Sequence, residues 1–265
     1  MLYQERYTDG EVIQMAVTTT TGLPKQIRDV THSTVSLLSA RSGVSRMTQH
    51  RVETGESDAG LRTLRELALA AGLDISINLL PASDPDAAAG ARSIIDASVD
   101  AGYLTPSQTE WAQRIRRYVG PELNPIDVVT EAGRVTNPLH RVGAVLLTGG
   151  WDELKLASAA LSAGGEWLLS GTPVLERIAD EPIALDPHAI VYAEDPEAVA
   201  RFLSHLRPAR AATATIVVMP MAPIAKVDSW TDGKFNLVAP VQAIIDSIGL
   251  GGSTAEAALA IAREW

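Results

Sequence analysis

Residues 34–56 read TVSLLSARSGVSRMTQHRVETGE, and this stretch predicts a short helix followed by a tight turn. Thr34 can cap the N-terminus of the helix, because a hydroxyl there accepts a hydrogen bond from a free backbone N–H. Leu38 lies one turn further on and gives the helix an inward-facing side. Gly43 suits the left-handed backbone conformation that commonly ends a helix.

A second short helix is predicted directly after this turn. Ser45 can cap its N-terminus, the helix runs from Arg46 to about residue 54, and Gly55 ends it. Val52 is expected to face the interior. Two helices joined in this way are typical of a helix-turn-helix, whose second helix enters the major groove of DNA.

The flanking sequence extends this pattern to a small helical unit over residues 21–80. The leucines at 61, 64, 67 and 69 predict a fourth helix that packs on the other three. The segment DISINLL at 74–80 alternates polar and apolar residues, so it is a candidate strand. The segment PASDPDAAAGA at 81–91 predicts a linker. Residues 1–20 lack helical periodicity and are expected to form a flexible N-terminal arm.

Acidic and basic residues are distributed unevenly along the chain. The formal net charge is −10, which argues against nucleic-acid binding by the surface as a whole. Residues 15–80, however, hold seven Lys or Arg and six Asp or Glu, whereas residues 81–265 hold 14 and 23. The charge therefore permits DNA binding at the N-terminal unit and disfavours it elsewhere. Because one module with so few basic residues binds weakly at physiological salt, a homodimer on a paired site is expected.

The composition limits the other functional classes. The chain of 265 residues has no cysteine, so it has no disulfide framework and no thiolate metal site. Its five histidines show no metal-ligand spacing. No apolar run approaches the roughly 18 residues needed to span a bilayer, and the polar first ten residues do not predict a signal peptide. We therefore expect a cytoplasmic protein with no membrane partner.

The second half of the chain alternates predicted strands and helices from Val142 onward. VGAVLL (142–147), EWLLS (166–170), AIVYA (189–193) and ATIVVMP (214–220) predict strands, and LKLASA (154–159) is a candidate hairpin partner of the first. Helices are predicted to open at Thr172-Pro173 and Asp195-Pro196, and amphipathic helices over Pro240–Ser247 and Thr254–Trp265. This pattern predicts an α/β domain over 141–265. Helices opened by Thr105-Pro106 and Asn124-Pro125 predict a helical spacer within 81–140.

The predicted helix-turn-helix resembles the XRE/Cro-like regulator family. The resemblance lies in Gly43-Val44-Ser45-Arg46, in Arg51-Val52-Glu53-Thr54-Gly55, and in Ala70-Ala71-Gly72-Leu73-Asp74 after the leucine-rich helix. Two positions depart from the family, which has a buried alanine where this chain has Ser39 and a buried aliphatic residue where it has Gln49. Either the recognition helix is rotated or Met47 fills the core in place of Gln49.

This resemblance implies that the first turn of the recognition helix faces the major groove. Arg46 and Arg51 have the fork geometry that reads guanine N7 and O6, and Thr34 is expected to hold a phosphate. The complete set of predicted DNA contacts is Lys25, Arg28, Thr34, Ser45, Arg46, Met47, Gln49, His50 and Arg51. The alternative is that the arginines are solvated surface charges of a four-helix protein-binding module.

The C-terminal half resembles the AbiEi-type antitoxin and transcriptional-regulator family. The resemblance lies in Trp167-Leu168-Leu169-Ser170-Gly171-Thr172, in AIVYAEDP, in VVMP, and most specifically in Ala239-Pro240-Val241-Gln242 with Asp246 and Glu256-Ala257. It implies a helix-turn-helix joined to a domain similar to the nucleotidyltransferase fold.

An active nucleotidyltransferase holds Mg²⁺ on two carboxylates one residue apart. In this chain Asp186 is followed by His188 where the second carboxylate belongs, and Pro187 between them weakens the strand. We therefore predict a non-catalytic domain with no catalytic residue, no metal and no cofactor.

The sequence thus predicts a multidomain α + α/β protein: a λ-repressor-like helix-turn-helix unit, a helical spacer and a nucleotidyltransferase-like domain. The predicted function is sequence-specific regulation of transcription, by repression, with double-stranded operator DNA as the partner. A narrower version is the antitoxin of a toxin–antitoxin pair, whose further partner is a cognate toxin protein. Two alternatives stay open, namely a ligand-sensing regulator with a pocket in the α/β domain and an active nucleotidyltransferase.

Overall fold

The computed structural model of the chain describes residues 22–77, 79–182 and 187–264. The N-terminal arm predicted for residues 1–20 lies outside the described residues, as does Asp186. Contacts divide the chain into two units between Leu79 and Leu80. None of the helices in the described ranges is long and apolar enough to cross a membrane.

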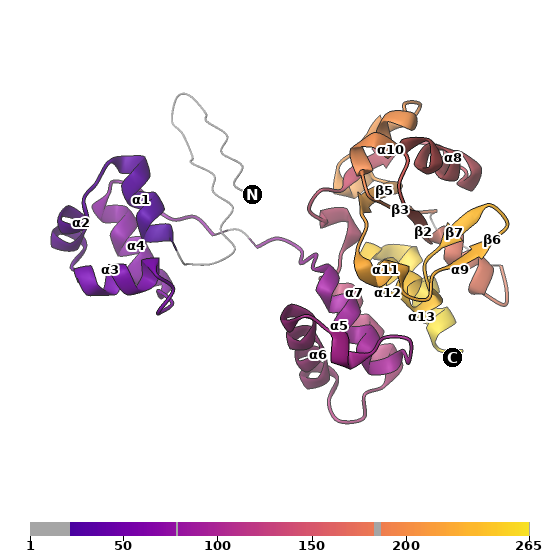
Figure 1. Cartoon of the computed structure of the whole chain (residues 1–265), viewed down its shortest axis with the longest axis horizontal. Helices are drawn as coiled ribbons and strands as arrows, with labels where there is room; N and C mark the ends of the chain where they lie inside the picture. The colour runs from indigo at the N-terminus through magenta and orange to yellow at the C-terminus, as the bar shows by residue number, and fades with distance from the viewer. Residues whose placement is uncertain (1–21, 78, 183–186, 265) are drawn as a thin grey trace. The chain divides into compact units, whose positions relative to one another are not determined.

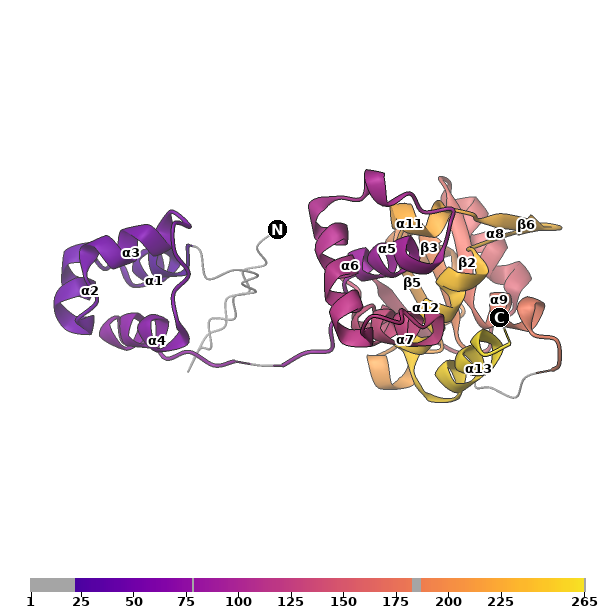
Figure 2. The same cartoon turned by 90° about the horizontal axis from the view of Figure 1, so that it is seen from below.

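The first unit is a cluster of four short helices (Figures 1 and 2). They are α1 (Leu23–Thr31), α2 (Val35–Ser42), α3 (Arg46–Glu53) and α4 (Leu61–Ala70). Both helices predicted for residues 34–54 are confirmed, together with their caps. The fourth predicted helix is also confirmed, and it contains all four leucines of the pattern.

A small aliphatic core holds these four helices together. Ile27, Leu38, Leu67 and Ala68 form its centre, one from α1, one from α2 and two from α4. Leu61 and Leu69 are 53% and 49% exposed, so the prediction that all four leucines of α4 pack inward is wrong. The reason is helical periodicity, since only Leu64, Leu67 and Ala68 fall on the side that faces α1 and α2.

The strand predicted for residues 74–80 does not form among its described members. Residues 74–77, 79 and 80 have no regular secondary structure. Ile75 packs against the core of the first unit, whereas Ile77 and Leu79 are 60% and 95% exposed. A strand needs a hydrogen-bonded neighbour, and no described strand lies beside this segment. The alternation in the sequence was therefore not sufficient to produce a strand within one chain.

The linker predicted for 81–91 is mostly a helix of the second unit. Ser83 forms an isolated antiparallel bridge with Thr136, and Asp84 caps α5 (Pro85–Ile95) by accepting a hydrogen bond from Asp86 N at 3.0 Å. The small residues that made this segment resemble a linker instead allow close packing. A Cβ added at Gly90 would lie 2.7 Å from the backbone nitrogen of Ala112.

The predicted helical spacer belongs to the same unit as the α/β domain. Its elements are α5, η1 (Ala101–Tyr103), α6 (Pro106–Val119), α7 (Pro125–Val135) and η2 (Pro138–His140). Residues of α5, α6 and α7 share one hydrophobic core with the strands that follow. The fully buried Arg92 strengthens this attachment, because its Nη1 and Nη2 donate to the carbonyls of Ile224 at 2.9 Å and Val227 at 3.0 Å.

A seven-stranded mixed sheet forms the centre of the second unit. Its strands are β1 (Val145–Thr148), β2 (Trp167–Gly171), β3 (Ala189–Ala193), β4 (Arg207–Pro208), β5 (Ile216–Pro220), β6 (Trp230–Asp232) and β7 (Phe235–Leu237), in the order β4-β1-β5-β3-β2-β7-β6. β3 and β5 are parallel, β1 runs antiparallel to β5, and β2 runs antiparallel to β3. The four strands predicted from apolar runs are confirmed, and β4, β6 and β7 were not predicted.

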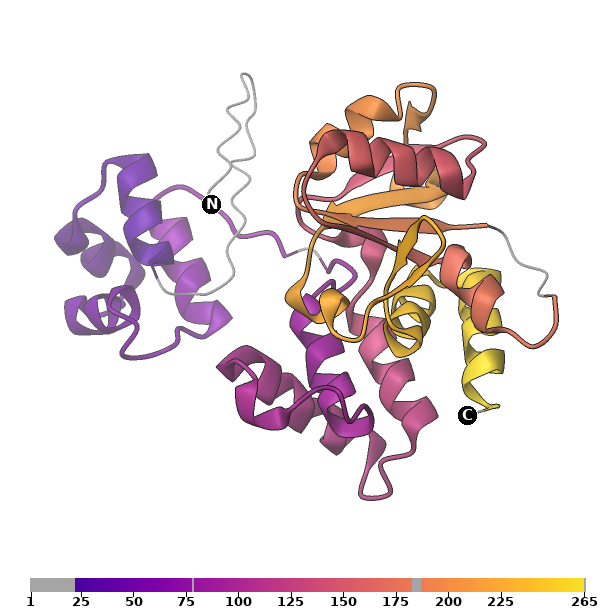
Figure 3. The same ribbon diagram turned by 45° about the vertical axis from the view of Figure 1, so that its right-hand side comes forward.

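Helices cover both faces of this sheet (Figure 3). α8 (Glu153–Ala163) and α10 (Pro196–Phe202) lie on one face, and α9 (Thr172–Ile178), α12 (Pro240–Leu250) and α13 (Gly252–Ala262) lie on the other. α11 (Pro223–Lys226) follows β5. The hairpin partner predicted at 154–159 is wrong, because this segment lies in α8. Asp152 caps that helix, and Leu156 and Ala160, one turn apart, are both fully buried.

The helices α7 and α12 approach each other closely. A Cβ added at Gly133 would lie 2.4 Å from Cγ2 of Ile248, and one added at Gly249 would lie 3.1 Å from the carbonyl oxygen of Gly133. Only glycine fits at these two positions, because any side chain would push the helices apart. Together, the helices and the seven-stranded sheet give the chain as a whole a mixed α and α/β fold class.

Candidate nucleic-acid interface

The turn between α2 and α3 is fixed by local hydrogen bonds. Thr34 Oγ1 accepts from Leu37 N at 3.2 Å, and Ser45 Oγ accepts from Thr48 N at 3.0 Å, so both helices begin at a capped N-terminus. Gly43, with φ of 71°, ends α2 in the left-handed region. A residue with a Cβ would be strained at that position.

The buried side of α3 is set by two residues one turn apart. Gln49 is 1% exposed and Val52 is 2% exposed. Gln49 Nε2 donates to the carbonyl of Val44 at 3.2 Å, while its Oε1 is buried without a partner. Met47 is 68% exposed, so it does not replace Gln49 in the core. The helix is therefore not rotated, and Gln49 occupies the aliphatic position. It cannot contact a base, and we remove it from the predicted set.

The remaining predicted residues of α3 lie on its exposed side. At 100° per residue, Arg46, Met47, His50 and Arg51 span one arc of the helix surface, opposite Gln49 and Val52. All four are exposed, as is the cap residue Ser45. Arg46 forms no ion pair within the described part of the chain, and Arg51 Nε lies 3.9 Å from Glu56 Oε2 with both side chains more than half exposed. These groups are free to meet a ligand.

The two other supporting positions, Thr34 and Lys25, are also exposed. The hydroxyl oxygen of Thr34 accepts the capping bond, which leaves its proton free to donate to a phosphate oxygen. Lys25 lies in the first turn of α1 and forms no ion pair with any described residue. Both residues can contribute contacts to a nucleic-acid backbone.

Arg28 has a different role from the one the sequence predicts. Its Nη2 donates to both carboxylate oxygens of Glu53, at 2.8 and 2.9 Å, and its Nε donates at 3.2 Å. The two side chains are only 19% and 17% exposed. This bidentate pair joins α1 to the end of α3, so the Arg28 charge is neutralised within the unit. We therefore assign Arg28 to positioning the recognition helix.

In the second unit, a buried polar cluster occupies the region that resembles a nucleotidyltransferase. Asp246 on α12 accepts hydrogen bonds from Ser170 Oγ at 2.6 Å, from Tyr192 OH at 2.9 Å and from Gln242 Nε2 at 2.9 Å. All four residues are at most 1% exposed. The sequence resemblance singled out Ser170 and Asp246, but the burial of their side chains could not be read from it.

Burial raises the pKa of the Asp246 carboxyl, and the three hydrogen bonds together with the charge of Arg141 oppose this rise. Burial and the neighbouring Asp246 likewise hold the pKa of Tyr192 well above its usual range. The acceptor capacity of Asp246 is thus taken up by protein donors. His188 Nδ1 lies 3.2 Å from Thr254 Oγ1. Within the described ranges, no group of three His, Cys, Asp or Glu residues could hold a metal ion.

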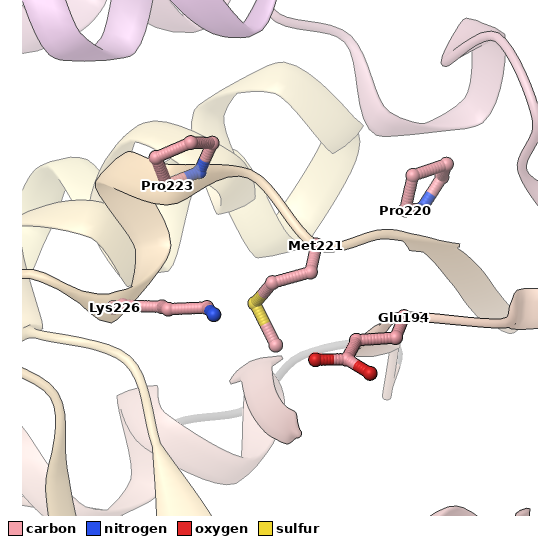
Figure 4. A pocket seen from close by; sticks show the side chains of 5 residues that line it. All are labelled: Glu194, Pro220, Met221, Pro223 and Lys226. Atoms are coloured by element: carbon pink, nitrogen blue, oxygen red, sulfur yellow. The ribbon is translucent and has the colours of Figure 1, made fainter. Parts of the chain in front are cut away.

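A shallow cavity of about 390 Å³ lies at the carboxyl ends of the parallel strands β3 and β5 (Figure 4). In an α/β sheet, this is the edge at which ligands commonly bind. Glu194, Met221 and Lys226 line the cavity together with two prolines. Lys226 Nζ pairs with Glu166, which lowers its capacity to bind an anion. The cavity is therefore lined by both charged and apolar side chains.

Comparison of the chain with protein-family models, with curated proteins and with solved structures gave no match in any of the three. The two family resemblances therefore stay predictions from the sequence.

Proposed function

We propose that the first unit binds double-stranded DNA in a sequence-dependent manner and that the protein regulates transcription as a repressor. One observation carries this proposal: Gln49 and Val52 anchor α3 from one side, while Arg46, Met47, His50 and Arg51 are exposed on the other. An α-helix that presents such a row can enter the major groove, and a bidentate arginine–guanine contact discriminates by roughly 1–3 kcal/mol.

Electrostatics supports two copies on the DNA. Of the seven basic residues between residues 22 and 77, Arg28 and Arg65 pair with Glu53 and Asp74 at 3.0 Å or less. The few remaining charges release few counterions, so one copy binds weakly at physiological salt. A homodimer on a two-fold operator doubles these contacts and reads both half-sites.

The second unit is proposed to be non-catalytic. Within the described residues, the buried carboxylate of Asp246 is enclosed by Ser170, Tyr192 and Gln242. A buried carboxylate of this kind cannot coordinate a metal that also holds a triphosphate. Incubation with labelled nucleoside triphosphates and Mg²⁺ tests this point. Transfer of label that is abolished by Asp186→Ala would contradict it.

DNA binding is tested by fluorescence anisotropy with the DNA upstream of the protein's own gene and a shuffled duplex of equal length. The wild-type chain is expected to prefer the upstream DNA. The Arg46→Ala/Arg51→Ala variant should lose at least about tenfold in affinity, because two base or phosphate contacts are removed. The matched control is Arg116→Ala/Arg117→Ala, which removes the same charge from an exposed part of α6 and should leave binding unchanged.

The narrower proposal is that this regulator is an antitoxin. It makes a separate prediction, that the gene is co-transcribed with a toxin whose protein product copurifies with the full chain. A gene that stands alone, with no copurifying partner, would leave a free-standing repressor as the proposed function.

A further inference from the structure

We infer that the groove between α8 and α10 is a docking site for an amphipathic helix of a partner protein, whose apolar side is flanked by acidic residues. The two helices pack against each other in the second unit (Figure 1). A groove of about 490 Å³ lies between them, lined by Leu154 and Ser158 of α8 and by Phe202 at the end of α10. This inference does not depend on DNA binding by the first unit.

The groove exposes large apolar side chains that are not part of the core. Leu154 and Leu161 of α8 are 54% and 72% exposed, and Phe202 is 55% exposed. Leu154, Ser158 and Leu161 follow one another at helical spacing, so they share one side of α8. The other side of this helix already packs into the core of the second unit. Exposed apolar side chains gathered in this way mark surfaces that bind another molecule.

The shape of the groove favours a helix over an extended segment. Ser158 is small and lies between the two leucines of the stripe, so it leaves space for an inserted side chain. Apolar residues of a docked helix repeat at i, i+3, i+4 and i+7, which matches two leucines seven residues apart. An extended segment would have to pair with the sheet edge, and the edge strand β4 has only two residues.

Basic side chains surround the groove near the end of α10. His205 lines it, Arg201 precedes Phe202, and Arg207 pairs with Thr148 in the sheet, shortly before α8 begins. All three basic side chains are exposed, and none forms an ion pair with a described residue. The sequence contains no Asp or Glu from residue 198 to residue 227. The border of the groove is therefore basic, and it attracts an acidic partner.

The carboxylates near the groove do not cancel this charge. Asp152 also lines the groove, and its carboxylate lies 3.1 Å from Lys155 Nζ. Glu153 is paired with Arg177 at 2.7 Å. Glu197, which lies one turn before Arg201 on α10, balances one arginine at most, so an excess of basic groups remains.

Two other occupants fit the groove less well. In a two-fold contact between two copies of this chain, Arg201 and Arg207 of one copy would face the same basic border of the other. A nucleic acid would meet the arginines, but its phosphate backbone offers no apolar surface to cover Leu154, Leu161 and Phe202. An acidic amphipathic helix satisfies both the apolar and the basic part of the groove.

Binding is tested by fluorescence anisotropy with the full-length chain and labelled synthetic peptides of about 14 residues, which form roughly four helical turns. The acidic peptide carries leucines at i, i+3, i+4 and i+7 with glutamates on both flanks. A basic peptide has lysine in place of each glutamate, and a scrambled peptide keeps the acidic composition without the apolar side. The acidic peptide should bind at least about tenfold more tightly than either, and less tightly as salt is added. Equal affinities for the acidic and basic peptides would overturn the inference.

Variants locate the binding surface. The apolar double variant Leu154→Asp/Phe202→Asp should lose at least about tenfold in affinity for the acidic peptide. Its control is Tyr103→Asp/Tyr118→Asp, which places the same charges at two tyrosines that are 87% and 57% exposed and should bind as the wild type does. Ser158→Trp fills the groove without changing the charge and should also prevent binding. Circular dichroism checks that the helix content is unchanged. Wild-type affinity in the apolar double variant would contradict the proposed site.

The charge of the border is tested separately. Arg201→Ala/Arg207→Ala should weaken binding of the acidic peptide several-fold, whereas Arg116→Ala/Arg117→Ala should not. If light scattering shows a wild-type dimer that the apolar double variant converts to monomers, a second copy occupies the groove. If Arg201→Ala/Arg207→Ala loses affinity for duplex DNA and keeps its affinity for the peptide, the arginines serve a nucleic acid. Either result would refute the partner helix.

Discussion

The two units of this chain differ in where their notable polar side chains lie: they are exposed in the first unit and buried in the second. In the first unit, Arg46 and Arg51 are exposed, and the buried face of α3 consists of Gln49 and Val52. In the second unit, Asp246 lies inside and its acceptor capacity is used by three protein donors. The difference shows where a ligand can be recognised, because only exposed groups can exchange their water for a partner.

A polar residue within a sequence motif can either contact a ligand or stabilise the interior of the protein. Gln49 stands in a recognition helix, yet its side chain serves the interior of the unit. Asp246 stands in a segment that was singled out by sequence resemblance, yet its hydrogen bonds join α12 to β2 and β3. For Gln49, position in a motif therefore predicted the helix correctly and the role of the side chain incorrectly.

The largest effect is expected from Asp246→Ala. The change leaves the hydroxyls of Ser170 and Tyr192 and the amide of Gln242 unpaired in the interior, at roughly 1–3 kcal/mol each, so a loss of at least about 3 kcal/mol in the free energy of unfolding is expected. All five tryptophans of the chain lie in the second unit, so denaturation followed by tryptophan fluorescence reports on that unit.

Asp246→Asn is the control for this change, because the amide retains hydrogen-bonding capacity and should lose less stability. Circular dichroism should show that the helices of the first unit still melt as in the wild type. If Asp246→Ala unfolds at the wild-type denaturant concentration, the cluster does not stabilise the second unit.

The next effect contrasts Arg28 with Lys25. Arg28→Ala breaks a partly buried bidentate pair and should destabilise the first unit by about 1 kcal/mol. Lys25→Ala should leave stability unchanged. It should reduce the slope of log affinity for DNA against log salt concentration by about one. Thermal melting by circular dichroism and anisotropy titrations at several salt concentrations distinguish these outcomes. An unchanged salt slope for Lys25→Ala would exclude it from the interface.

A smaller effect is expected from Gln49→Leu. The leucine removes a buried amide oxygen that has no partner and supplies the aliphatic side chain that this core position favours. The loss of the bond to the Val44 carbonyl offsets part of the gain, so stability should rise by about 1 kcal/mol or less. DNA affinity should not change. A fall in affinity at unchanged stability would mean that Gln49 reaches a base after all.

The smallest effect is a pH dependence of the second unit. Because the pKa of Asp246 is raised, the folded chain holds its proton more tightly than the unfolded chain does. The resulting stabilisation is complete below the ordinary value of 3.8 and is lost as the pH rises through the raised pKa. The free energy of unfolding of the wild type, measured relative to Asp246→Asn, should therefore fall as the pH increases above about 4. A difference that grows with pH would show that the charged form is favoured.

The sequence predicted the fold where local signals and tertiary packing agree. Thr34, Gly43 and Ser45 bracket α2 and α3 as expected, and prolines at helix starts marked α6, α7, α9 and α10. The prediction failed where one sequence pattern is compatible with both a strand and a helix. LKLASA alternates like a strand but also repeats at helical spacing, and the capping bond from Asp152 selects the helix.

The candidate site was predictable in part for a related reason. Exposure of Arg46 and Arg51 follows from the helical period, which the sequence displays. The pairing of Arg28 with Glu53 does not, because it joins residues of different helices whose approach depends on the packed core. The short strands β6 and β7 also escaped prediction, since three residues carry too little periodicity to be recognised.

The close contact between α7 and α12 has a consequence for the synthesis of this protein. Gly133 is made halfway through synthesis, and the helix that carries Ile248 and Gly249 is made near the end of the chain. The first unit has its own hydrophobic core, so it can fold while translation continues. The helices α5 to α7 emerge next and can pack on one another, but the face of α7 that contacts α12 stays uncovered until α12 has been released. During that interval they expose apolar surface, so the order of synthesis makes this stretch the one that chaperones have most reason to bind.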